Sequence, residues 1–315
     1  MLTIDYAHMC LQREKSLVLV CVGVVILLTA LARILLPDGY SALQMVPHIV
    51  HPTNATNISA HHTNISALHT TKAPTTSPSK RKTSIAFLVP VISTTERSEA
   101  DLPIFTVLLP TLFPSLELDK YDYGMFLGYD TGDRLYDNST SMQALGKRFH
   151  EVTLGNISLQ TFGFNNTRNA PCWVWNGLFE LAYKQGFDYF FQINDDLTFE
   201  PAPWTSTFVS TLEITNNLGV VGPWDINNNQ PIMTQSFVHR THYDIFHTYY
   251  PPEFRNWYSD NWISIVYAKE ETTRLNQFKV RNGHAGVRYR IHYAGALVER
   301  LDVLGKAQIA KYKGK

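Results

Sequence analysis

The apolar positions of the chain are unevenly distributed, and the longest run of them lies near the N-terminus. Residues 16–36 are apolar except for Arg33, and a helix of 21 residues spans about 31 Å, roughly the hydrocarbon thickness of a bilayer. Arg13 and Lys15 precede this run, and a long stretch without Lys or Arg follows it. The positive-inside bias therefore predicts that residues 1–15 are a cytosolic tail, that the run is an uncleaved signal-anchor, and that the rest is luminal.

A cleaved signal peptide is the alternative, because Ala-Leu-Ala at 30–32 fits the pattern of small residues before a cleavage site. We favour the anchor, since the apolar run exceeds the usual signal-peptide core of about 7–15 residues. Of the cysteines Cys10, Cys21 and Cys172, only the last lies beyond the run, so no luminal disulfide within the chain is expected. Six N-x-[ST] sequons also lie beyond it and agree with a secretory topology. They are Asn54, Asn57, Asn64, Asn138, Asn156 and Asn165.

A polar segment separates the anchor from the rest of the chain. Residues 37–82 are rich in Pro, Ser, Thr, His and Asn, and "TNISAHH" at 56–62 is followed directly by "TNISALH" at 63–69. Each repeat carries a sequon and little apolar surface, so neither can contribute a packed core. We expect a solvated, disordered stem that holds a domain away from the membrane.

From Thr83 onward, short apolar runs alternate with polar loops, as in an α/β domain over residues 83–315. The runs at 83–93, 123–130, 188–193 and 216–225 have the length and the Ile, Phe and Val content of buried strands. This order predicts a mostly parallel, Rossmann-like sheet with flanking helices. In such sheets ligands gather at the carboxyl ends of the strands.

A helix is predicted over residues 169–186 between two of these strands. Asn169 is its expected N-cap, Pro171 lies in the first turn and Gly186 ends it. Its inner face is expected to carry four apolar side chains. They are Trp175, Leu178, Phe179 and Ala182.

Composition adds little beyond this pattern. The chain has 315 residues, is 44% hydrophobic and 17% charged, and has a formal net charge of zero. No general attraction to nucleic acid or to acidic surfaces follows from that balance.

The segment "DYFFQINDDLTFEP", residues 188–201, carries the main chemical signal. A buried strand ends in Asn194, Asp195 and Asp196, and two adjacent carboxylates are costly unless a cation or ligand compensates them. Mg²⁺ or Mn²⁺ would do so, because these ions bind one or two carboxylates together with phosphate oxygens. The alternative is an exposed acidic turn with Asp196 as a helix N-cap.

Several of these pieces resemble the membrane-anchored, Golgi-type glycosyltransferases with the GT-A fold, over about residues 83–293. They are "IAFLVPVIS", "FLGYD", "RNAPCWVWNG", "FFQINDD" in the place of the Asp-x-Asp motif, and "NWYSDNW" at 256–262 in the place of an acidic acceptor-site motif. The family motif usually has an acid where this chain has Asn194. A looser similarity extends to the phage DNA-glucosyltransferase-like group, but the secretory topology argues against a DNA substrate.

The resemblance implies a single-pass type II protein of the Golgi membrane with a luminal, hexosyltransferase-like domain. Such an enzyme moves a sugar from a nucleotide-diphospho-sugar, UDP-linked in our expectation, to a hydroxyl of a glycan or glycoprotein. Mn²⁺ or Mg²⁺ would be bound by Asp195, Asp196 and a late histidine, for which His284 ranks before His292. The remaining expected donor-binding residues are Asp130, Asp133, Arg168, Asn194 and Arg288.

On the acceptor side, the resemblance implies that Asp260 is the general base if the reaction inverts the anomeric centre, with Asp225 as a second candidate. Trp257, Tyr258 and Trp262 are either core residues or stacking surfaces for sugars. Two rival hypotheses remain. Asn194 favours an inactive, lectin-like relative, and a metal-dependent hydrolase is disfavoured because no further Asp/His cluster or phosphate-binding loop is visible.

Overall fold

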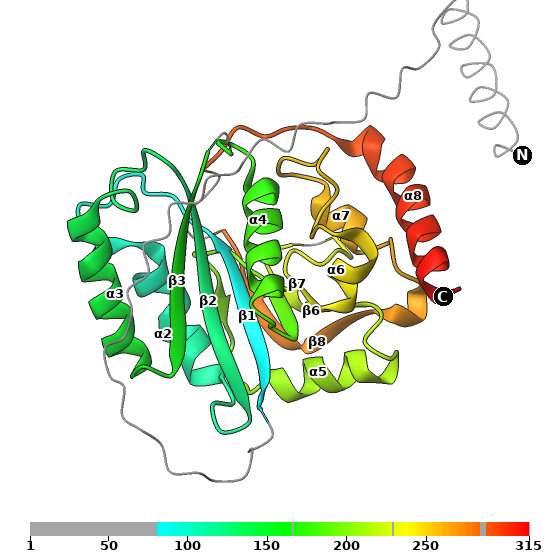
Figure 1. The fold of residues 1–315 in the computed structure, drawn as a ribbon, viewed down its shortest axis with the longest axis horizontal. Coiled ribbons are helices and arrows are strands. Elements are labelled where there is room, and N and C mark those ends of the chain that lie inside the picture. Colours follow the sequence, from blue (N-terminus) through cyan, green and yellow to red (C-terminus); the bar gives the residue numbers. More distant parts are fainter. Residues whose placement is uncertain (1–80, 166, 229, 284–287, 315) are drawn as a thin grey trace, which may run out of the picture. The chain divides into compact units, whose positions relative to one another are not determined.

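A computed structural model describes residues 81–165, 167–228, 230–283 and 288–314 (Figure 1). The predicted tail and signal-anchor, and the predicted stem up to residue 80, lie outside them. Within this described part of the chain, no helix has both the length and the apolar character that crossing a bilayer requires.

The described residues form one eight-stranded sheet in the order β3-β2-β1-β4-β7-β6-β8-β5. The β1–β2, β2–β3, β1–β4 and β6–β8 pairs are parallel, whereas β7 pairs antiparallel with β4 and β6, and β5 with β8. Six strands therefore run in one direction, which confirms the mostly parallel sheet. The strands are β1 (Thr83–Pro90), β2 (Tyr121–Asp130), β3 (Ile157–Phe164), β4 (Tyr189–Gln192), β5 (Thr198–Phe199), β6 (Val220–Asp225), β7 (Ser236–His239) and β8 (Thr272–Arg281).

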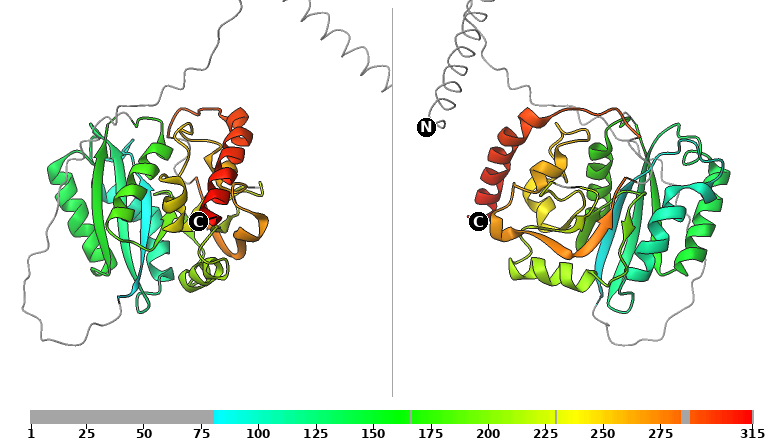
Figure 2. Two further views of the ribbon diagram at one scale, coloured as in Figure 1. Left: turned by 45° about the vertical axis from the view of Figure 1, so that its right-hand side comes forward. Right: turned by 180° about the vertical axis from the view of Figure 1, so that it is seen from behind.

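Helices cover both faces of this sheet (Figures 1 and 2). Alternate residues of β1 point to opposite faces, so Ile85 and Phe87 join one apolar cluster and Ala86 and Leu88 join the other. The first cluster is covered by η2 (Ile104–Leu108), α2 (Leu109–Leu112), α3 (Ser139–Thr153) and α5 (Thr205–Ile214). The second is covered by α4 (Pro171–Lys184), α6 (Thr241–Phe246), α7 (Ser259–Ile263) and α8 (Gly295–Lys313).

All four predicted strands are present, because each buries nearly every side chain. The predicted helix is α4, and its stop is also confirmed. Gly186 has φ 84°, and the next amide, that of Phe187, donates to the carbonyl of Ala182 at 3.3 Å. The predicted N-cap is wrong. The residue before the helix is Ala170, and Asn169 instead accepts a hydrogen bond at 2.8 Å from the backbone N–H of Arg290.

Close packing of α4 on β3 gives a stability prediction. A glycine inside a helix normally costs about 1 kcal/mol relative to alanine. At Gly177, however, an added Cβ would collide with the ring of Phe164, which is 3% exposed. We expect Gly177→Ala to lower the free energy of unfolding by about 1–3 kcal/mol. Urea denaturation would measure this, with Ser210→Ala on the exposed face of α5 as the matched control.

Candidate active site

A cavity of about 810 Å³ opens where the six parallel strands end, within the usual size range of ligand sites. Its wall includes a residue at or just after the carboxyl end of each of these strands. In the order of the sequence they are Val91 after β1, Asp130 at the end of β2, Thr167 after β3, Asn194 after β4, Asp225 at the end of β6 and Asn282 after β8. The first turn of α4 completes the wall. The sheet therefore gathers residues that are far apart in the sequence at the place expected for a ligand.

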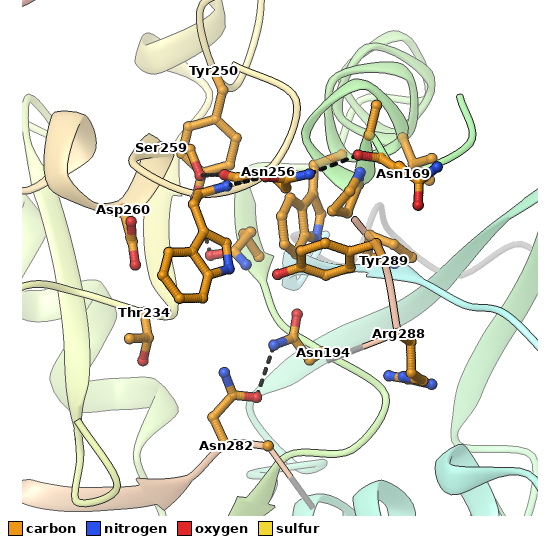
Figure 3. A pocket seen from close by; sticks show the side chains of 18 of the residues that line it. Asn169, Asn194, Thr234, Tyr250, Asn256, Ser259, Asp260, Asn282, Arg288 and Tyr289 are labelled. Atoms are coloured by element: carbon orange, nitrogen blue, oxygen red, sulfur yellow. Dashed lines mark hydrogen bonds between the residues drawn. The ribbon is translucent and has the colours of Figure 1, made fainter. Parts of the chain in front are cut away.

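The cavity has two chemically different ends (Figure 3). Asp260 and Thr234 lie on one side in this view, Arg288 and Asn169 lie on the other, and Asn194 lies between them. The arginine end comprises Arg168, Arg288, Asp130, Asp196 and the start of α4. The amide end comprises Asp225, Asn227, Thr234, Asp260, Asn261 and Asn282.

The structure gives Asp195 a partner that the sequence did not reveal. Asp195 is fully buried and does not line the cavity, and both of its carboxylate oxygens accept from Arg288, one of them at 3.0 Å from Nη1. Burial raises the pKa of Asp195, and the guanidinium opposes that shift. The charge of Asp195 is therefore compensated by Arg288. Of the two aspartates expected to bind a metal ion, only Asp196 lines the cavity.

Asp196 is 3% exposed and forms part of the cavity wall, with its Oδ1 3.7 Å from Nη2 of Arg288. Its expected companion His284 lies outside the described residues. The alternative ligand, His292, is exposed and does not line the cavity. Among the described residues, no three His, Cys, Asp or Glu side chains form a metal cluster.

Asn194, which replaces the expected acid, has a defined role in the wall. Its amide nitrogen donates to Oδ1 of Asn282 at 2.8 Å, which joins the tip of β4 to the end of β8 between the two ends of the cavity (Figure 3). An aspartate could not donate this bond. Local hydrogen bonding therefore accounts for an amide at this position.

This bond leads to a second prediction. Asn194→Asp would place two acceptor oxygens together and add a third carboxylate to the tip of β4. We expect the affinity for the expected nucleotide-diphospho-sugar to fall about tenfold, because the part-buried bond that shapes the wall is lost and the added charge repels a diphosphate. Isothermal titration would measure it, with the exposed Asn216→Asp as the control. Tighter binding in Asn194→Asp would show that the usual acid is the better residue here.

Asp225 and Asp260 differ in the hydrogen bonds that their carboxylates accept. Asp225 accepts from the backbone N–H groups of Asn227 and Asn282 and from the hydroxyl of Thr234, at 3.0, 3.3 and 2.9 Å. It therefore organises the loops after β6 and β8. Asp260, at the start of α7, accepts from the backbone N–H of Asn261 at 3.0 Å, and burial raises its pKa. Asp260 is the better placed of the two to act as a base.

Of the other expected donor-binding residues, two line the cavity and one does not. Asp130 accepts a hydrogen bond from the hydroxyl of Thr167 at the cavity wall, and Arg168 is an exposed residue of the same wall. Asp133 lies off the cavity. Its carboxylate accepts from the N–H and Oγ of Ser93 at 2.8 and 2.7 Å and from two backbone N–H groups of its own loop. It holds the loops after β1 and β2 together.

Of the aromatic residues that could stack on a sugar, two line the cavity and one belongs to the core. Trp262 is 1% exposed and belongs to the core, whereas Trp257 is 41% exposed and lines the cavity with Tyr258. Asn256 is the first residue of the "NWYSDNW" motif, and the sequence alone predicted no role for it. Its side chain donates to the carbonyls of Asn169 and Arg290 at 2.8 and 3.0 Å. Asn256 therefore connects the start of α4 to the segment that carries Arg288. No local sequence pattern predicts bonds between residues so far apart in the chain.

Comparison with known proteins gives only distant likenesses. No protein-family model and no curated protein matches the chain. Among solved structures, S. aureus TarS 1-349 in complex with UDP has 10% identity and a TM-score of 0.42, covering 70% of this chain and 64% of that chain. The complex of the same protein with UDP-GlcNAc has 10% identity and a TM-score of 0.41, with 71% and 66% covered. A further TarS structure has 11% identity and a TM-score of 0.40, with 64% and 37% covered. This chain thus spans less than two thirds of the length of these TarS chains, and likeness at this level transfers no function.

Proposed function

We propose that the chain is a glycosyltransferase that moves a sugar from a nucleotide-diphospho-sugar, UDP-linked, to a hydroxyl of a glycan or glycoprotein. The observation that supports this most is the two-ended cavity at the carboxyl ends of the parallel strands. The arginine end suits the donor's diphosphate. The amide end carries Asp260 and suits the acceptor hydroxyl.

The diphosphate is placed at the arginine end by charge. Arg168 and Arg288 line it, and a guanidinium group offers several N–H donors to phosphate oxygens. The 14-residue helix α4 begins there, and the positive end of its dipole favours an anion. Asp195 holds Arg288 in place from behind the wall.

A divalent ion fits this end with Asp196 as its one carboxylate ligand. The described cavity wall has four carboxylates and two guanidinium groups, a net charge of −2 when all are ionised. A diphosphate would add to this negative charge, so a further cation is favourable, and Mg²⁺ is often held by one carboxylate with phosphates and water. When bound, Mn²⁺ or Mg²⁺ would neutralise charge on the departing nucleotide.

In an inverting reaction, Asp260 takes the proton of the acceptor hydroxyl as that oxygen bonds to the anomeric carbon. The bond between the anomeric carbon and the diphosphate breaks, and the nucleoside diphosphate leaves with the bonding electrons. Burial raises the pKa of Asp260 and so strengthens it as a base. Trp257, exposed beside it, offers an apolar face to a sugar ring.

We further propose that this domain works in the Golgi lumen, anchored as a type II membrane protein by residues 16–36. The sequons at Asn138, Asn156 and Asn165 are all on exposed residues, so glycans could be attached there. The inactive, lectin-like alternative was favoured by Asn194. Because the bond to Asn282 explains that residue, we prefer the enzyme.

The decisive experiment measures UDP release from a panel of UDP-sugars by the full-length chain, with Mn²⁺ and with EDTA. We expect release with at least one donor, its stimulation by Mn²⁺, and its loss in Asp196→Ala. The matched control is Asp119→Ala, an exposed turn residue far from the cavity wall. Sugar binding without any nucleotide release would support the lectin-like relative instead.

A further inference from the structure

The amide end of the cavity is built for hydrogen bonding to neutral groups. Asn227, Asn261 and Asn282 place side-chain amides there, and Thr234 places a hydroxyl there. A side-chain amide has two donor hydrogens and an acceptor, which matches a sugar hydroxyl that both donates and accepts. Asn227 already donates one hydrogen to the carbonyl of Asn282, and Oδ1 of Asn282 already accepts from Asn194, both at 2.8 Å. Trp257 adds an apolar surface at the same cavity wall.

Among the described residues that line this end, the formal charges are all negative. Asp225 and Asp260 line it, and both arginines of the described cavity wall belong to the opposite end. Arg274 is not part of the wall. Its guanidinium donates to the carbonyl of Gln230 at 3.3 Å and to Oδ1 of Asn276 at 3.1 Å.

The charge of Asp225 is also fixed in place. Three donors from the loops after β6 and β8 hold its two oxygens, so its carboxylate cannot turn away from an incoming anion. Asp225 is 5% exposed, and interactions between charges are screened less at such a site than in open solvent. An anionic group bound at the amide end would therefore be repelled by the carboxylate of Asp225.

We infer that the acceptor is an uncharged, hydroxyl-rich sugar residue, and that the amide end discriminates against acceptors carrying a carboxylate, sulfate or phosphate beside the reacting hydroxyl. This specificity rests on the proposed function and adds to it the class of acceptor. Asp225 is then a specificity-determining residue, because it supplies negative charge without taking the acceptor's proton.

The test compares two acceptors that differ only at C6, p-nitrophenyl glucoside and p-nitrophenyl glucuronide, with the full-length chain and the donor found in the UDP-release panel. A galactoside and galacturonide pair repeats the comparison with another sugar. We expect kcat/KM to favour the neutral member at least tenfold, and the ratio to shrink as NaCl rises from low to high concentration. Equal or better use of the glucuronide and galacturonide would overturn the inference.

A charge variant gives an independent readout. Asn261→Lys adds a cation to the amide end and is expected to narrow the neutral-to-anionic ratio at least threefold. Ser210→Lys adds the same charge on the exposed face of α5 and should leave the ratio unchanged. An unchanged ratio in Asn261→Lys, with the KM for the donor as in the parent chain, would contradict the inference.

The two levels of the proposal fail differently. Absence of both UDP-sugar binding, measured by titration calorimetry, and UDP release would remove the proposed function itself. Transfer that ignores the charge of the acceptor would leave the glycosyltransferase in place and remove only the neutral-acceptor specificity.

Discussion

Replacing Asp260 by asparagine is expected to lower kcat by about 10²–10⁴-fold, the usual contribution of a general base. The substitution keeps the shape of the side chain and its bond to the backbone N–H of Asn261, so the KM for the donor should change little. Asp119→Asn, in an exposed turn, is the matched control. A variant that retains more than a tenth of the parent kcat would exclude Asp260 as the base.

The pH dependence of this residue has a definite sign. A base must be deprotonated, and burial raises the pKa of Asp260, so kcat/KM should rise with pH through a pKa above the ordinary aspartate value. The same shift affects stability. A carboxyl whose pKa is higher in the folded chain contributes stability that is present below the unfolded-state pKa and lost as pH rises through the folded-state pKa. Asp260→Asn should lack both effects, as rate profiles and denaturation at several pH values would show.

Removing the guanidinium of Arg288 is expected to have the largest effect on stability. Arg288→Met leaves Asp195 fully buried without its partner, and breaking a buried pair in this way costs about 3–5 kcal/mol. Without the guanidinium, burial and the charge of Asp196 raise the pKa of Asp195 further, so the loss of stability should be greater at pH 8 than at pH 5. Denaturant midpoints at the two pH values would measure both effects.

A double-mutant cycle separates the pair from the packing around it. Asp195→Asn combined with Arg288→Met removes both charges, and we expect it to recover more than half of the stability lost in Arg288→Met. Lys147→Met, in a surface pair on α3, is the control and should change stability by less than about 1 kcal/mol. If the double variant is as unstable as Arg288→Met, the buried charge is not the cause.

The strands that could be predicted from the sequence are those with apolar runs. Residues 85–89 of β1 are fully buried, and such a run can hardly be anything but a central strand. β8 was missed because "TTRLNQFKVR" has a single fully buried side chain, that of Val280. β7 was missed because only Phe237 and Val238 of its four residues are apolar. It pairs antiparallel with β4 on one side and with β6 on the other.

The site was predictable where a candidate follows a buried strand. Asp130, Asn194, Asp196 and Asp225 all line the cavity for that reason. The partner of Asp195 was not predictable, because the bond to Arg288 joins residues 93 positions apart. Only the folded structure shows that the two adjacent aspartates differ in their surroundings: Asp195 is buried behind the cavity wall, and Asp196 lines the cavity.

The two ends of the cavity also come from different stretches of the sheet. The arginine end combines residues from β1–β4 and the start of α4 with Arg288 after β8, whereas the connection between β6 and β7 carries Asn227 and Thr234 of the amide end. Under the proposed function, a foreign segment grafted between Asp225 and Ser236 is therefore expected to change the acceptor that is used and to leave the choice of nucleotide donor unchanged.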